Sequence, residues 1–92
     1  MNDKTVRAII EGRVRGVGFR YATHEKAAAL RLTGWVKNES NGTVSALLQG
    51  TDSTLSDMIE WLHVGPPFSE VTRVDIQVEK AHPIVEDFSI RY

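Results

Sequence analysis

The chain of 92 residues contains no cysteine, so no disulfide can form within it. A secreted domain of this size often depends on disulfides, and their absence favours a reducing compartment. The first ten residues, MNDKTVRAII, also lack the apolar run and the small-residue cleavage site of a secretory signal peptide. We therefore expect a cytoplasmic protein.

Long hydrophobic runs and an excess of charge of one sign are absent as well. No segment approaches the roughly 20 apolar residues that span a bilayer, so no membrane partner is expected. The 11 basic and 12 acidic residues give a formal net charge of −1. Because affinity for nucleic acid comes largely from neutralising many phosphates, this balance better suits one small anionic ligand. We expect a monomer that binds a small molecule and no nucleic acid.

The residues that are present indicate one domain over residues 1–92, without an internal boundary. Alternation of apolar and polar side chains predicts a strand over residues 5–14. That alternation places three apolar side chains on one face: Val6, Ala8 and Ile10. Strong helix formers predict a helix over residues 21–32, which Gly34 is expected to end.

The rest of the chain continues with a predicted hairpin over residues 34–50. Asn41 and Gly42 are the preferred central pair of a two-residue type I′ turn. A second helix is predicted over residues 51–65, with Thr51, Asp52 or Ser53 as its cap. Strands follow over residues 71–80 and 88–92. The order β-α-β-β-α-β predicts an α+β, ferredoxin-like sandwich, with an antiparallel sheet and two helices on one face.

The stretch RVRGVGFRYA, residues 13–22, joins the first predicted strand to the first predicted helix. Gly16 and Gly18 permit backbone angles that a Cβ would resist. Successive N–H groups ahead of a helix can then converge on one anion. The planar guanidinium of Arg20 can bind two phosphate oxygens. The residues therefore indicate a phosphate cradle, although the pattern is neither a Walker loop nor a dinucleotide fingerprint.

Two other interpretations of this stretch remain open from the residues alone. An RNA-recognition module has the same order of elements, and residues 15–22 match its signature in part. However, Val17 and Ala22 stand where two of its three stacking aromatics belong, and the stretch ends the first strand instead of lying mid-domain. The other interpretation is a tight glycine turn with solvated arginines and no ligand.

Three segments together resemble the acylphosphatase family. EGRVRGVGFR resembles its first signature, the loop G-x-V-x-G-V-x-F-R after the first strand. GWVKNESNGTVSALLQG resembles the second, G-W-V-x-N-x-x-x-G-T-V followed by Q-G, and FSIRY looks like the usual acylphosphatase ending. The resemblance extends over nearly the whole chain with the same order of elements.

This resemblance implies a small enzyme that hydrolyses acyl phosphates to carboxylate and phosphate without a metal ion or cofactor. It implies that the Arg20 guanidinium binds the phosphoryl oxygens and that the Asn38 amide positions the attacking water. It also implies a cradle of backbone N–H groups from Arg15, Gly16, Val17, Gly18, Phe19 and Arg20. The alternative is a non-catalytic phosphate-sensing or RNA-binding module, which would need Arg20 but have little use for Asn38.

One residue departs from the acylphosphatase signature, and several others are expected to have structural roles only. Arg15 stands where glutamine is usual in the family, and it can tighten phosphate binding or alter the substrate preference. The three histidines have no spacing that suggests a metal site, and structural roles are expected for them: His24, His63 and His82. Thr43 is expected to support the hairpin turn.

Overall fold

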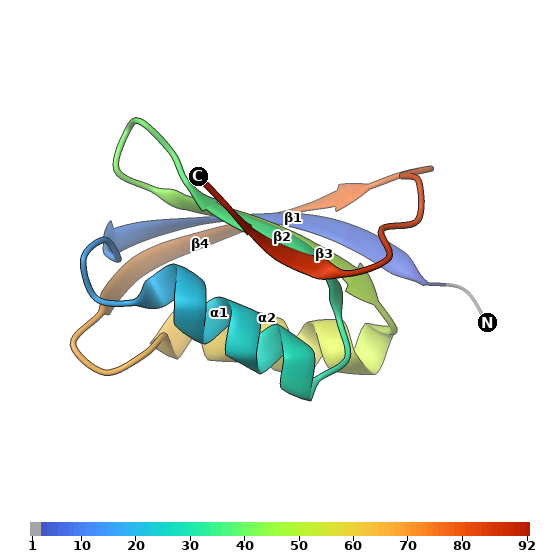
Figure 1. Cartoon of the computed structure of the whole chain (residues 1–92), viewed down its shortest axis with the longest axis horizontal. Helices are drawn as coiled ribbons and strands as arrows, with labels where there is room; N and C mark the ends of the chain where they lie inside the picture. The colour runs from blue at the N-terminus through green and yellow to red at the C-terminus, as the bar shows by residue number, and fades with distance from the viewer. Residues whose placement is uncertain (1–2) are drawn as a thin grey trace.

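A computed structural model describes residues 3–92 of the chain, which form two helices and five strands (Figure 1). The observed strands lie within a residue or two of the predicted ones. Along the chain the elements are β1 (Lys4–Arg13), α1 (Phe19–Ala29), β2 (Thr33–Asn38), β3 (Val44–Gly50), α2 (Asp52–Val64), β4 (Glu70–Glu79) and β5 (Phe88–Arg91). Neither helix is long and apolar enough to cross a membrane.

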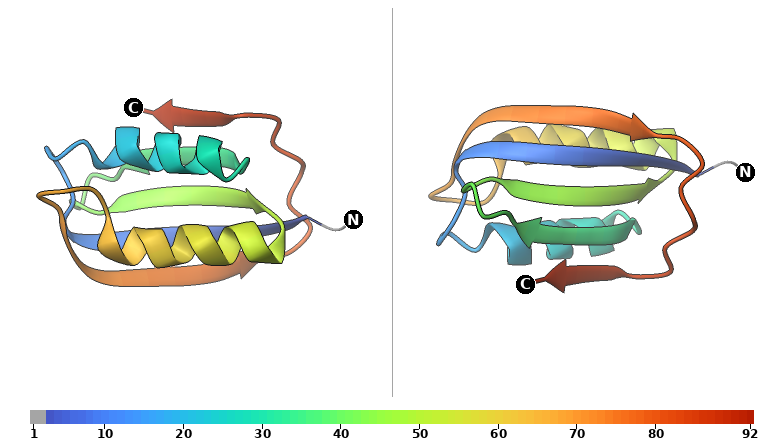
Figure 2. Two further views of the ribbon diagram at one scale, coloured as in Figure 1. Left: turned by 90° about the horizontal axis from the view of Figure 1, so that it is seen from below. Right: turned by 90° about the horizontal axis from the view of Figure 1, so that it is seen from above.

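The strands form one sheet in the order β4-β1-β3-β2-β5, and both helices cover the same face of it (Figure 2). This confirms the predicted ferredoxin-like α+β fold. The sheet is mixed, however, because β5 pairs with β2 in parallel while the other neighbours are antiparallel. The reason is topological: β4 is antiparallel to β2, so a chain that turns back after β4 and joins the opposite edge must run parallel to β2.

The core lies between the sheet and the helices. In β1 the alternation predicted from the sequence is confirmed, because Val6, Ala8 and Ile10 are buried in the core. Helix α2 contributes three buried apolar side chains at helical spacing: Leu55, Met58 and Leu62. Trp35 is also buried, at 7% exposure, but it alternates along β2 with Gly34 and Val36, which face the core. Its side chain therefore lies on the opposite face of the sheet, where the cationic groups of Arg7, Lys37 and Arg91 lie over its ring.

Helix α1 does not end at Gly34, as the sequence analysis predicted. It ends at Ala29, and Arg31 takes the left-handed conformation with a φ of 59°. The N–H of Leu32 then donates to the carbonyl of Ala27 at 2.9 Å, which closes the helix as a Schellman motif does. Gly34 lies in β2, where a Cβ would overlap the carbonyl oxygen of Leu47 on β3. Close approach of two strands, and not helix termination, explains this glycine.

The hairpin between β2 and β3 has a five-residue connection, residues 39–43, so the predicted two-residue type I′ turn is wrong. Within this connection Gly42 alone has a positive φ, of 92°. The side-chain oxygen of Asn41 accepts hydrogen bonds from both the N–H and the hydroxyl of Thr43, at 3.1 and 2.7 Å. These bonds stabilise a longer turn, and they give Thr43 the supporting role expected from the sequence.

Candidate active site

The loop between β1 and α1, drawn in Figure 1, is held at both ends by side chains that are buried. Val14 is 1% exposed and Phe19 is 2% exposed, and the Phe19 ring lies 5.9 Å from the ring of Trp61. Val17, between them, packs against the core as well. Because these anchors fix its course, the loop can present backbone groups in one arrangement before a ligand arrives.

The backbone of this loop alternates in handedness. Gly16 and Gly18 have φ values of 72° and 73°, and Val17 between them does not adopt a positive φ. Such alternation turns successive N–H groups toward a common point, as in anion-binding nests. A Cβ at either glycine would meet no atom within 4 Å, so these glycines are needed for their conformation and not for space.

The two helices begin in different ways. Helix α2 begins with a capping box, in which the Thr51 hydroxyl accepts from the Thr54 N–H at 3.2 Å, and Asp52 adds a negative charge to its first turn. Thr51 is therefore the cap among the three predicted candidates. Helix α1 begins after Gly18, which offers no side chain, and its first turn contains no acid. The free N–H groups of this turn, with the positive end of the helix dipole, are left for an anion.

Arg20, in the first turn of α1, is held by the last residues of the chain. Its Nη1 donates to the carbonyl of Arg91 at 3.1 Å, and its Cζ lies 4.8 Å from the ring centroid of Tyr92. Both contacts depend on the pairing of β5 beside β2. The sheet edge formed by the C-terminal strand thus fixes a guanidinium at the start of the first helix.

Asn38 is the last residue of β2, opposite Val44 of β3. It lines an open cavity of about 230 Å³ together with Arg20 and the loop. The cavity contains most of the residues predicted for the site: Arg15, Gly16, Gly18, Phe19, Arg20 and Asn38. The side chain of Val17 does not line it, because that side chain packs against the core.

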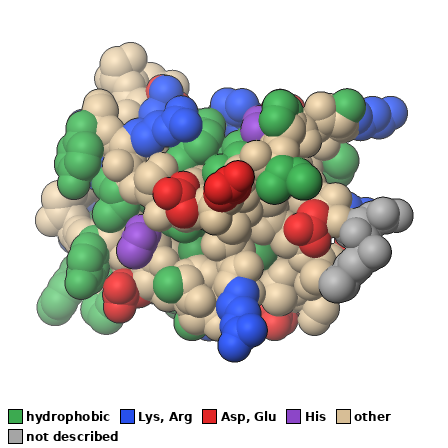
Figure 3. All heavy atoms as spheres, turned by 45° about the vertical axis from the view of Figure 1, so that its right-hand side comes forward, with side chains coloured by type: hydrophobic (Ala, Val, Ile, Leu, Met, Phe, Trp, Pro, Cys, Tyr) green, Lys and Arg blue, Asp and Glu red, His purple; other side chains and the backbone are tan. Residues whose placement is uncertain are grey.

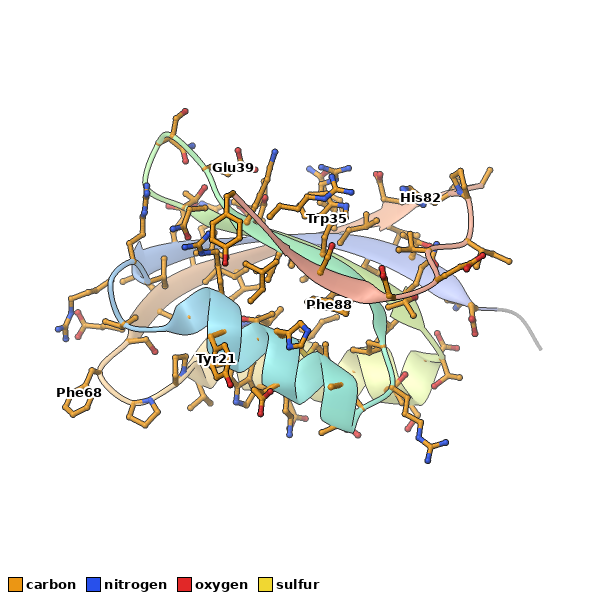
Figure 4. All side chains as sticks on the ribbon, in the orientation of Figure 1. Tyr21, Trp35, Glu39, Phe68, His82 and Phe88 are labelled. Carbon is orange, nitrogen blue, oxygen red and sulfur yellow. The ribbon has the colours of Figure 1, made fainter. Side chains whose placement is uncertain are left out.

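Four lining residues were missed by sequence reasoning: Val14, Tyr21, Ile90 and Tyr92. Val14 is the buried anchor at the start of the loop. Tyr21 follows Arg20 on α1 and is largely exposed, and Figure 4 shows it on the outer side of the helix. The feature of the sequence that could have indicated Tyr21 is its position next to Arg20. For Ile90 and Tyr92 the signal was the C-terminal FSIRY, which the sequence analysis noted without assigning it to the site.

The histidines make local contacts outside the cavity. The ring of His24 packs edge-on against Phe88, with 5.9 Å between the ring centroids. His63 Nδ1 lies 2.9 Å from a helix carbonyl, and His82 Nδ1 lies 2.7 Å from the carbonyl of Pro83. Across residues 3–92, no three His, Asp or Glu side chains are grouped so that they could hold a metal ion.

Comparison with known proteins decides the family. The acylphosphatase family model matches residues 6–90. The chain belongs to the acylphosphatase family. An acylphosphatase of Rhizobium etli is 46% identical over 89 residues, which cover 97% of this chain and 95% of that one.

Solved acylphosphatase structures have the same fold. The crystal structure of the Bacillus subtilis acylphosphatase matches with a TM-score of 0.94 at 38% identity, covering 97% of this chain and 99% of that one. The acylphosphatase of Coxiella burnetii matches with a TM-score of 0.87 at 36% identity, covering 98% and 94%. This chain is therefore an enzyme of the acylphosphatase family, and the comparisons do not favour the phosphate-sensing or RNA-binding alternative.

Proposed function

We propose that this acylphosphatase hydrolyses the carboxyl–phosphate bond of acyl phosphates, with Arg20 and Asn38 acting on one phosphoryl group. The observation that carries the proposal is that both side chains line the same cavity as a glycine loop that precedes an uncapped helix. Each of the three parts comes from a different element, and the fold brings them together. Substrate binding and water activation thus have separate groups at one site.

The phosphoryl group binds at the cradle formed by residues 15–20. Its oxygens accept from the loop N–H groups and from the Arg20 guanidinium, which forms charge-assisted bonds in a planar fork. Phosphoryl transfer spreads negative charge over three equatorial oxygens, so fixed donors around them stabilise the transition state. The anchoring of Arg20 by Arg91 and Tyr92 favours such a fixed arrangement.

The Asn38 side-chain oxygen accepts a hydrogen bond from a water molecule. This bond orients the water so that a lone pair of the water oxygen points at phosphorus. The phosphoryl group passes directly to this water. In support, none of the described residues that line the cavity is Ser, Thr, Cys, Lys, His, Asp or Glu. The lining side chains that could act as nucleophiles are Tyr21 and Tyr92, and both are largely exposed to solvent. Neutral Asn38 can orient water but cannot remove its proton, which passes to a phosphoryl oxygen and leaves with the product phosphate. The reaction therefore relies on a good leaving group.

The leaving group of an acyl phosphate is a carboxylate, whose conjugate acid has a pKa of about 4. It departs without a general acid, and the cavity lining supplies no carboxylic acid or histidine for that role. A phosphate monoester expels a far more basic alkoxide or phenoxide. The same site should therefore hydrolyse monoesters poorly, which makes acyl phosphates the substrate class.

We further propose that the enzyme is a cytoplasmic monomer that does not bind nucleic acid. The formal net charge of −1 supports the absence of a nucleic-acid partner, and basic and acidic side chains are interspersed on the face shown in Figure 3. A monomer has a molar mass of 10.3 kDa in sedimentation equilibrium at all protein concentrations. Salt-dependent binding of oligonucleotides would contradict the absence of a nucleic-acid partner.

The activity is tested by hydrolysis of benzoyl phosphate in the presence of a chelator, with phenyl phosphate as the leaving-group control. We expect the wild type to hydrolyse benzoyl phosphate far faster than phenyl phosphate. Arg20→Gln and Asn38→Ala should both lose turnover, whereas Arg13→Gln, which removes an exposed charge before the loop, should retain it. An inert wild type that binds inorganic phosphate through Arg20 would instead favour the binding-module interpretation.

A further inference from the structure

The side chain of Arg15 reaches from the phosphate loop to the hairpin that follows Asn38. Its Nη1 donates to the backbone carbonyl of Glu39 at 3.0 Å. Glu39 directly follows Asn38 in the sequence and lies where β2 leaves the sheet (Figure 4). The bond therefore joins the segment that would hold phosphate to the segment that would hold water.

Glu39 is itself fixed to the hairpin by several groups. Its N–H donates to the carbonyl of Thr43 at 2.8 Å, and its carbonyl also accepts from the N–H of Gly42 at 3.2 Å. Its carboxylate accepts from the hydroxyl of Ser45 and lies 3.7 Å from Lys37 Nζ. A donor attached to the Glu39 carbonyl is consequently attached to a well-held point one residue from Asn38.

The backbone ladders of the sheet do not make this connection. Pairing of β1 with β3 ends at Ile10 opposite Val44, and pairing of β2 with β3 ends at Asn38 opposite the same Val44. The phosphate loop and the turn over residues 39–43 both extend beyond these last pairs. Their relative position is thus set by contacts outside the ladders, of which the Arg15 hydrogen bond is one.

We propose that the Arg15 side chain has a positioning role: it holds the phosphate loop and Asn38 at the separation needed for attack, and it is not itself a ligand of the substrate. The inference rests on the function proposed above. Attack on phosphorus requires the water and the phosphoryl group at a set distance and angle, and small displacements slow such reactions strongly. The charged side chain at this position acts on geometry through the Glu39 carbonyl.

This assignment separates Arg15 from Arg20 experimentally. Arg15→Ala leaves the cradle and Arg20 in place, so we expect the dissociation constant of inorganic phosphate to be unchanged. The turnover number for benzoyl phosphate should fall roughly three- to tenfold, the range that corresponds to one net hydrogen bond. Arg15→Lys retains a positive charge and a hydrogen-bond donor at this position and should recover part of the turnover.

A matched control and a structural measurement complete the test. Arg13→Ala removes the same charge two residues earlier, at an exposed position, and should leave turnover and phosphate binding unchanged. In Arg15→Ala the amide of Gly42, which shares the Glu39 carbonyl, should change its hydrogen-exchange rate, whereas Arg13→Ala should not alter it.

Two results would overturn this inference while leaving the proposed function intact. One is a weakened phosphate affinity in Arg15→Ala with an unchanged turnover number, which would make Arg15 a substrate ligand. The other is a wild-type turnover number in Arg15→Ala while Asn38→Ala is inactive. Full activity of Asn38→Ala in the same series would contradict the proposed role of Asn38, and the positioning role of Arg15 would fall with it.

Discussion

The contact between Tyr92 and Arg20 offers a direct way to perturb the proposed phosphate site without altering the groups proposed to bind phosphate. Tyr92 is 98% exposed, and its ring centroid lies 4.8 Å from Arg20 Cζ. An arginine side chain carries about 2 kcal/mol of rotamer entropy, part of which ligand binding must remove. A ring that already restrains the guanidinium lowers that cost. We predict that Tyr92→Leu weakens phosphate binding.

The size of the effect follows from the exposure of the contact. A cation–π contact at an exposed site is worth about 0.5–1 kcal/mol, which corresponds to a two- to fivefold change in a dissociation constant. Since the hydrogen bond from Arg20 to the Arg91 carbonyl remains, the loss should not exceed this range. If Arg20 contacts substrate and transition state alike, KM rises by the same factor and kcat stays constant.

The assay is titration of inorganic phosphate together with steady-state hydrolysis of benzoyl phosphate, for wild type, Tyr92→Leu and Tyr92→Phe. Phenylalanine keeps the ring and should match the wild type. Equal losses in both variants would refute the reasoning, because they would assign the effect to the hydroxyl. An unchanged phosphate affinity in Tyr92→Leu would show that the ring does not restrain Arg20.

Three further predictions concern the backbone. Gly18→Ala places a Cβ at a φ of 73°, so it should lower the free energy of unfolding by about 1–2 kcal/mol and weaken phosphate binding, as measured by urea denaturation and phosphate titration. Thr51→Ala removes the cap of α2 and should lower the free energy of unfolding by about 1 kcal/mol without changing turnover; a loss of turnover in folded protein would contradict this. Gly34→Ala forces a Cβ onto the Leu47 carbonyl, so it should unfold the protein or lower its thermal midpoint far more than Thr51→Ala does, and a midpoint equal to that of the wild type would show that the strands can separate.

Local patterns were sufficient to predict most of the fold. The alternation of Val6, Ala8 and Ile10 and the helical spacing in α2 each report which side faces the core. Order and type of the elements follow from such patterns, and the fold follows from their order. The parallel pairing of β5 was not predictable in this way, because it depends on where the chain goes after β4.

Two predictions were wrong, the two-residue hairpin turn and the end of helix α1, and they were wrong for a similar physical reason. Asn41 and Gly42 favour a two-residue turn, but the Asn41 side chain accepts from Thr43 instead and the turn is longer. Gly34 resembles a helix terminator, but Arg31 takes the left-handed conformation earlier. In both places side-chain hydrogen bonds or strand packing outweigh the conformational preference of one residue.

The candidate site was predictable where its residues are close in sequence or fall in a family signature. Gly16, Gly18 and Arg20 lie in one loop, and Asn38 follows from the second signature. The contribution of the chain end was not predictable from spacing. Tyr92 meets Arg20 because β5 occupies the edge beside β2, a contact between opposite ends of the sequence.

The central claim is that water attacks the phosphorus atom of an acyl phosphate held in the loop cradle. The most direct test is hydrolysis of benzoyl phosphate by the wild-type enzyme in ¹⁸O-labelled water, followed by mass spectrometry of both products. The account predicts label in inorganic phosphate and none in benzoate. Label in benzoate would place the attack at the carbonyl carbon and would contradict the roles proposed for Arg20 and Asn38.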